Sequence, residues 1–115
     1  MQNSAETRPT AEDPRLSGRT YHIPFATVWD SILAMIKARR RWRLIYADEA
    51  SGIIKAEASR LLRTVDDVRL RVSLDDNALT RVDMRSVSRT GRADLGVNTR
   101  RIGRFFRELD RKLGV

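Results

Sequence analysis

The sequence predicts an α+β fold in which an antiparallel sheet of four to five strands is covered by a long C-terminal helix. Two kinds of apolar spacing carry this prediction: period-two alternation through the middle of the chain, and three- and four-residue spacing near its ends. The chain has 115 residues, of which 41% are hydrophobic and 33% charged, as is typical of one soluble globular domain. We therefore expect a single core between one sheet and its helices.

The first 18 residues show no apolar periodicity, are mostly polar and contain two of the three prolines. Such a segment cannot bury enough apolar surface to offset the entropy that ordering would cost. We expect residues 1–18 to be a disordered tail and residues 19–115 to form the domain. Residues 19–23 predict a short first strand that ends before Pro24.

Residues 25–41 predict an amphipathic helix, because apolar residues recur there at three- and four-residue spacing. This apolar face consists of Phe25, Val28, Trp29, Ile32, Leu33 and Ile36. Basic residues at the C-terminal end suit the negative end of the helix dipole. They are Lys37, Arg39, Arg40 and Arg41. A nucleic-acid or membrane-surface patch is the alternative interpretation of this cluster.

Four strand candidates follow, separated by turn-forming residues. They span residues 42–47, 52–61, 65–74 and 80–89. In the third candidate, Val68, Leu70, Val72 and Leu74 alternate with Asp67, Arg69, Arg71 and Ser73. In the fourth, Val82, Met84, Ser86 and Ser88 alternate with Arg81, Asp83, Arg85 and Arg89. Such alternation is typical of an antiparallel sheet with one covered face, and the mixed charges of the other face predict cross-strand ion pairs.

Residues 94–113 are predicted to form the last element, a long helix that covers the apolar face of the sheet. Its apolar stripe consists of Leu95, Ile102, Phe105, Phe106, Leu109 and Leu113. Asp94 is a suitable N-cap, because its carboxylate can accept bonds from backbone N–H groups. The predicted order is β-α-β-β-β-β-α, which is a helix-grip-like arrangement.

The chain is strongly basic, with a net charge of +8 and arginines as most of its 23 basic residues. Arginine makes planar, bidentate contacts with phosphate or carboxylate, which favours an anionic partner. Ordinary surface charge in an arginine-biased sequence is the alternative. The lack of cysteine excludes disulfides and cysteine nucleophiles, and the single histidine, His22, gives no metal cluster of the usual kind. We predict no metal, no cofactor and no catalytic residues, which argues against an enzyme.

No apolar run approaches the roughly 20 residues that a membrane-spanning helix needs. The N-terminus also lacks the apolar segment of a signal peptide. We expect a soluble protein without a membrane span, either cytoplasmic or, if a leader was removed from a longer precursor, periplasmic.

Asp66 and Asp67 are neighbours on a predicted strand, so their side chains point to opposite faces of the sheet. One carboxylate then points inward, where it is costly unless it is paired. The candidate partners are Arg85, Arg89 and Arg101. We expect the substitution Arg89→Ala to leave the inward carboxylate unpaired and to destabilise the fold strongly.

Two stretches, VDDVRLRV and RVDMRSVSRTGRADLGVNTRRI, resemble the signature of a bacterial and plastid family known as domain of unknown function 1499. The motif positions are Asp66, Asp67, Asp83, Arg85, Ser86, Ser88, Arg89, Gly91, Asp94, Gly96, Asn98, Arg101 and Ile102. This resemblance implies no established activity. Some members of that family look like envelope lipoproteins or carry membrane segments.

The leading functional hypothesis is a non-enzymatic binding module for a small or anionic ligand, with a polar site where the last strand meets the last helix. Its predicted residues are Asp66, Asp67, Arg85, Ser86, Ser88, Arg89, Asp94, Asn98 and Arg101. One alternative is a structural or protein-interaction accessory domain associated with the cell envelope. The other is non-specific binding of nucleic acid through the arginine clusters.

Overall fold

A computed structural model describes residues 4–9, 11–60, 64–89 and 96–115. It confirms the α+β class, with one antiparallel sheet of six strands and two α-helices. The elements are β1 (Ser4–Glu6), a 3₁₀ turn η1 (Pro14–Leu16), β2 (Arg19–Tyr21), α1 (Phe25–Ala38), β3 (Trp42–Asp48), β4 (Ile53–Ser59), β5 (Val65–Leu74), β6 (Thr80–Ser88) and α2 (Val97–Leu113). Within the described residues, none of the helices is long and apolar enough to cross a membrane.

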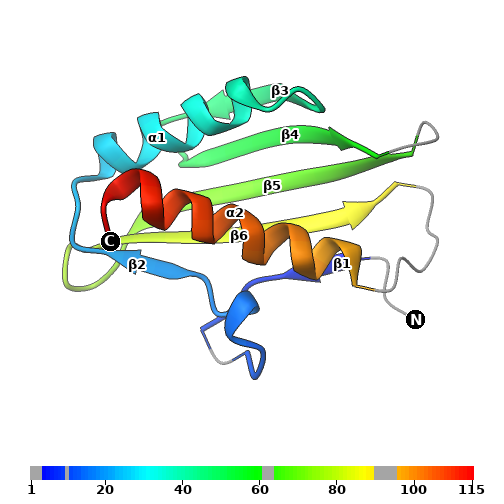
Figure 1. Ribbon diagram of the computed structural model, residues 1–115. Helices are drawn as coiled ribbons and strands as arrows, with labels where there is room; N and C mark the ends of the chain where they lie inside the picture. Colours follow the sequence, from blue (N-terminus) through cyan, green and yellow to red (C-terminus); the bar gives the residue numbers. More distant parts are fainter. Residues whose placement is uncertain (1–3, 10, 61–63, 90–95) are drawn as a thin grey trace.

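The sheet has the order β1-β6-β5-β4-β3, and β2 pairs with β6 as well. β1 lies along one part of β6 and β2 along another, so two short strands share one edge. Both helices lie on the same face of the sheet, as Figure 1 shows, and leave the other face open. The long strands β4, β5 and β6 therefore have one covered face and one face in contact with solvent.

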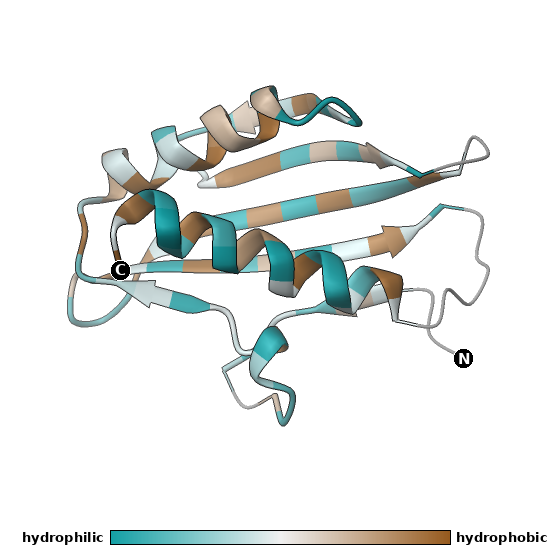
Figure 2. Cartoon of the chain, viewed as in Figure 1, coloured by the Kyte–Doolittle hydropathy of each residue, from teal (hydrophilic) through white to brown (hydrophobic). Residues whose placement is uncertain are grey.

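The core forms between the helices and the covered face of the sheet. Ile102, Phe105, Phe106 and Leu109 of α2 are fully buried, as is Leu70 of β5. In Figure 2 the polar side of α2 faces outward over this core. The predicted alternation is confirmed along most of β5 and β6, where buried and exposed residues follow one another. Leu74 is an exception, with an exposed fraction of 59%, because it is the last residue of its strand.

The N-terminal segment corrects the sequence prediction of a disordered tail. Residues 4–6 form β1 on the edge of β6, and the side-chain hydroxyl of Thr7 accepts a bond of 2.8 Å from the backbone N–H of Met84. Gly103 leaves room for the side chain of Arg15 from η1 to pack on α2, since a Cβ at this glycine would lie 3.0 Å from it. The sheet edge and the helix thus order this segment, and three-residue strands are too short for their alternation to be visible in the sequence.

The start of α2 also differs from the prediction. The helix begins at Val97, and Gly96 occupies the N-cap position with φ +89°, a left-handed conformation that glycine adopts without steric cost. Asp94, the predicted N-cap and one of the predicted site residues, lies outside the described residues.

Candidate functional site

The predicted site residues lie on both faces of the sheet rather than in one place. Asp66 and Asp67 are neighbours on β5 and point in opposite directions, as the sequence predicts. Asp66 has no exposed surface and lies under α2, whereas the Asp67 side chain is 52% exposed on the open face. Each face therefore needs its own interpretation.

Asp66 is the centre of a buried polar cluster, which we call the inner network. Its members are Arg60, Asp66, Ser86, Ser88, Asn98 and Arg101. The Asp66 carboxylate accepts a bond of 2.7 Å from Arg60 and one of 2.6 Å from Arg101. Two guanidinium groups thus compensate one carboxylate that water cannot reach.

Asn98 connects this ion cluster to β6. Its side-chain oxygen accepts bonds from Ser86 at 2.6 Å and from Arg101 at 2.9 Å, and its side-chain nitrogen donates to Ser88 at 3.0 Å. Arg60 also donates to the Ser88 hydroxyl at 2.9 Å. The inner network therefore joins β5, β6 and the first turns of α2. Its side chains bond to one another, although the buried Nε of Arg60 has no hydrogen-bond partner among the described residues.

Arg89 is not a partner of the buried carboxylate, so the prediction made for Arg89→Ala is wrong. It lies on the open face, where it donates to Asp67 and, at 2.6 Å, to Glu57. Sequence reasoning missed Arg60, which is the second partner of Asp66. Ala58 of β4 is buried directly opposite Asp66. Arg60 follows Ala58 by two residues, and side chains two apart along a strand share one face, so alternation could have identified Arg60 as a partner of Asp66.

We expect Arg89→Ala to raise the pKa of Glu57. Hydrogen bonds from Arg89, and next from Arg43, hold the pKa of this carboxyl below its ordinary value. A lowered folded-state pKa contributes stability above the unfolded-state pKa, and this contribution is lost as the pH falls through the folded-state pKa. The difference in Tm between wild type and variant should therefore shrink in acid. A ¹³C-detected NMR titration of Glu57 measures the shift directly, with Arg43→Ala as the milder control; an unchanged titration curve in Arg89→Ala contradicts the assignment.

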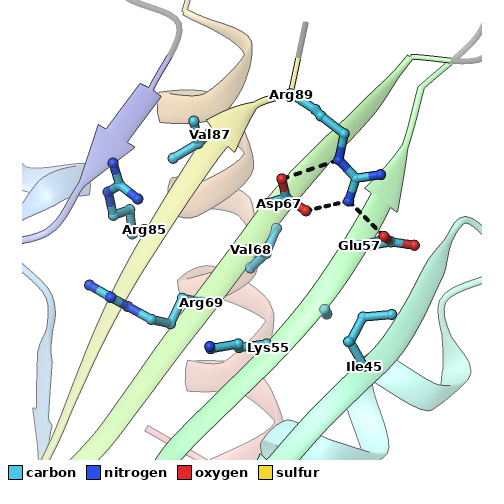
Figure 3. A pocket seen from close by; sticks show the side chains of 10 residues that line it. Ile45, Lys55, Glu57, Asp67, Val68, Arg69, Arg85, Val87 and Arg89 are labelled. Atoms are coloured by element: carbon cyan, nitrogen blue, oxygen red, sulfur yellow. Dashed lines mark hydrogen bonds and ion pairs between the residues drawn. The ribbon is translucent and has the colours of Figure 1, made fainter. Parts of the chain in front are cut away.

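The open face carries three cations side by side, which we call the cation row: Lys55, Arg69 and Arg85. Lys55 of β4 lies directly opposite Arg69 of β5, and Arg69 lies directly opposite Arg85 of β6. Figure 3 shows the three side chains beside one another across the strands. Like charges in directly opposite positions destabilise a sheet. The prediction of cross-strand ion pairs therefore fails between β4, β5 and β6 at these positions, whereas Arg85 does lie directly opposite an acidic residue, Glu6 of β1.

Little negative charge compensates the cation row. The carboxylate of Glu6 on β1 lies 3.4 Å from Arg69 and 3.7 Å from Arg85, and it is more than half exposed. Lys55 lies 5.6 Å from the centre of the Tyr46 ring. Among the described residues, one carboxylate thus pairs with two of the three cations, and Lys55 makes no ion pair.

A hollow of about 460 Å³ lies over the cation row, and we call it the open-face hollow. Its lining residues are Ile45, Lys55, Ala56, Glu57, Asp67, Val68, Arg69, Arg85, Val87 and Arg89. The two acidic side chains of this lining, Glu57 and Asp67, both pair with Arg89 (Figure 3). The hollow therefore presents the positive charges of the cation row, and a small anion is the ligand that this arrangement can hold.

Metal-ligating residues do not gather in the part of the chain that the structure describes. That part contains no group of three or more histidine, cysteine or acidic residues that could hold a metal ion. His22, the single histidine, lies at the rim of a separate hollow beside β2. Sequence reasoning missed Lys55 and Arg69 as site residues, because the composition of a strand does not reveal which residues lie opposite one another.

A comparison with protein families identifies one match. A family model described as "Protein of unknown function (DUF1499)" matches residues 2–109. The comparison with curated proteins finds no match. The matched range includes both the inner network and the cation row.

Proposed function

The chain belongs to this family of unknown function, and from the geometry of the open face we propose that it is a binding module that holds a small anionic ligand in the open-face hollow. The alignment of Lys55, Arg69 and Arg85 directly opposite one another is the observation that carries the proposal. Such a row lowers the stability of the unliganded sheet, and a bound anion would remove that repulsion. Residues kept at a cost to stability are typical of binding sites.

The side chains of the hollow suit phosphate or carboxylate groups. Arg69 and Arg85 offer planar guanidinium groups that can bind two oxygens of one anion, and Lys55 adds a compact charge beside them. Val87 and Ile45 contribute apolar surface at the same hollow. Its volume of about 460 Å³ lies within the range of small-molecule sites. A ligand with an anionic group and a small apolar part therefore fits best.

The inner network has a different role in this proposal. Its side chains bond to one another beneath α2, so they hold the helix against β5 and β6. Of the residues predicted for one site, we assign Asp67, Arg85 and Arg89 to the ligand side. Asp66, Ser86, Ser88, Asn98 and Arg101 are assigned to the support of the fold.

The first test is an NMR titration with inorganic pyrophosphate and, separately, citrate, which probe phosphate and carboxylate binding. We expect saturable shifts of the Lys55, Arg69 and Arg85 signals with at least one probe. Arg69→Gln should weaken that binding by about tenfold, since it removes one charge-assisted contact. Arg107→Gln makes the same change in charge on the opposite face of the molecule and should leave binding unchanged. Absence of saturable shifts, or equal loss in both variants, would overturn the proposal.

The stability of Arg69→Gln gives a second test. This substitution removes the repulsion of Arg69 by Lys55 and by Arg85, and it also removes the exposed ion pair of Arg69 with Glu6. Since two repulsive contacts outweigh one exposed pair, the folded protein should gain up to about 1 kcal/mol while it loses affinity. Urea denaturation at low salt measures the gain. A marked loss of stability instead would mean that Arg69 serves the fold, and would remove the argument for a binding site.

A second candidate function is non-specific binding of nucleic acid through α2. Four arginines are exposed along one side of this helix at spacings of four, three and four residues, and they are Arg100, Arg104, Arg107 and Arg111. The helix has two acidic residues, and both contact other elements: Glu108 pairs with Arg39, and Asp110 accepts a bond from Tyr21. At about 1.5 Å per residue, the stripe extends for about 16 Å, long enough to follow several phosphates of a duplex.

Fluorescence anisotropy with two unrelated DNA duplexes tests this candidate. Binding through four phosphate contacts should weaken steeply with salt, with a slope of about −3.6 in log affinity against log salt concentration. The double variant Arg104→Gln, Arg107→Gln should weaken both duplexes equally, and Arg69→Gln should not. Absence of binding at about 50 mM salt rules this candidate out and leaves the anion site unaffected.

A further inference from the structure

We propose that the free edge of β3 pairs with β3 of a second copy of this chain, which gives a two-fold symmetric dimer with one continuous sheet. β3 ends the sheet on the side away from β1 and β2, and its outer edge has no strand partner among the described residues. An edge strand presents backbone N–H and C=O groups that another strand can bind. This inference does not depend on the proposed anion site.

This edge strand exposes apolar side chains that a second strand could cover. Ile45 and Tyr46 are 49% and 47% exposed, and they are among the few large hydrophobic residues exposed in the described part of the chain. Ala47, the next residue, is exposed as well. Three consecutive exposed apolar residues on a sheet edge favour association with another strand.

The irregularity in β3 decides which register a pair of these strands can adopt. The pairing of β3 with β4 shifts between Leu44 and Tyr46, so Ile45 is an extra residue. Arg43 and Asp48 therefore both lie on the open face, opposite Glu57 and Ile53, although their numbers differ in parity. A two-fold axis through the sheet requires that residues of the same face lie opposite one another.

One register centred on this bulge satisfies that requirement. It places Arg43 opposite Asp48 of the second copy on the open face, and this contact occurs twice because of the symmetry. On the covered face it places Leu44 opposite Ala47. The carboxylate of Asp48 makes no ion pair with any residue in the described ranges. Arg43 pairs with Glu57 at 2.9 Å, but its side chain is 75% exposed, so a second copy can reach it as well.

Sedimentation velocity over a range of concentrations tests this inference, with charge exchange as the decisive comparison. We expect the wild type to shift from monomer to dimer as its concentration rises to about 0.5 mM. Arg43→Asp and Asp48→Arg, each alone, place like charges in opposite positions and should weaken the dimer by at least tenfold. The double variant Arg43→Asp, Asp48→Arg should restore it.

The control is Arg41→Asp, which makes the same charge change just before β3 and should leave association unchanged. Circular dichroism and Tm measurements confirm that each variant is folded, and restoration by the double variant separates an interface effect from a folding defect. A wild type that stays monomeric over the whole range overturns the inference. So does a dimer or larger species that is indifferent to all the charge changes.

Discussion

The substitution Arg101→Ala is expected to lower the free energy of unfolding by about 3–5 kcal/mol. Arg101 uses one guanidinium nitrogen to bond to Asp66, Asn98 and Ser86, at 2.6, 2.9 and 3.2 Å. Asp66 is fully buried, and the Arg101 side chain is only 11% exposed. The substitution leaves the carboxylate with one guanidinium in place of two, and it removes a donor from Asn98. A buried charge that loses its partner costs far more than an exposed one.

Urea denaturation measures this loss, and Arg104→Ala is the matched control. Arg104 lies on the same helix but is exposed, so its substitution should change the stability by less than about 0.5 kcal/mol. Arg101→Lys keeps the positive charge but loses the branched guanidinium donor, so its loss of stability should lie between those of Arg101→Ala and Arg104→Ala. Equal losses for Arg101→Ala and Arg104→Ala would mean that the inner network does not stabilise the fold.

The sequence was sufficient to predict that one aspartate of the Asp66–Asp67 pair is buried, because neighbours on a strand face opposite ways. It could also have excluded Arg85 and Arg89 as partners of that aspartate, since both alternate with the apolar residues of β6 and so share a face with Asp67. Arg101 then remains, as the structure confirms. The wrong prediction for Arg89 came from proximity in the sequence motif, without regard to the face that the residue occupies.

The cation row could not be predicted, although alternation places its members on one face. Which residues lie opposite one another depends on the register, and the register depends on the turns between strands. If β4 and β5 were shifted by two residues, Arg69 would lie opposite Glu57 rather than Lys55. A similar shift between β5 and β6 would place it opposite Asp83. The same composition would then form ion pairs, so the case for an anion site depends on pairings that only the structure provides.

Asp66→Ala is expected to destabilise the fold as strongly as Arg101→Ala does, by about 3–5 kcal/mol. Here the groups that lose their partner are two cations, whereas in Arg101→Ala the group is an anion. Without the carboxylate, the guanidinium groups of Arg60 and Arg101 share a largely enclosed space with no compensating negative charge. Ser88 retains its bond from Asn98 but cannot replace the lost charge. Arg60 can move toward solvent, since its side chain is 25% exposed, whereas Arg101 cannot. Most of the cost therefore arises at Arg101.

A double-mutant cycle shows whether Asp66 and Arg101 stabilise the fold through each other or whether each substitution lowers the stability independently. If Asp66 and Arg101 stabilise the fold through each other, the double variant should be more stable than the sum of the single losses predicts, by about 1–3 kcal/mol. Asp66→Asn, which keeps the shape but not the charge, should leave the same repulsion between the two arginines and cost nearly as much as Asp66→Ala. Losses that simply add would contradict a coupled network. They would imply that each residue is held by separate contacts, and α2 would then depend on its apolar face rather than on this ion cluster for its position against β5 and β6.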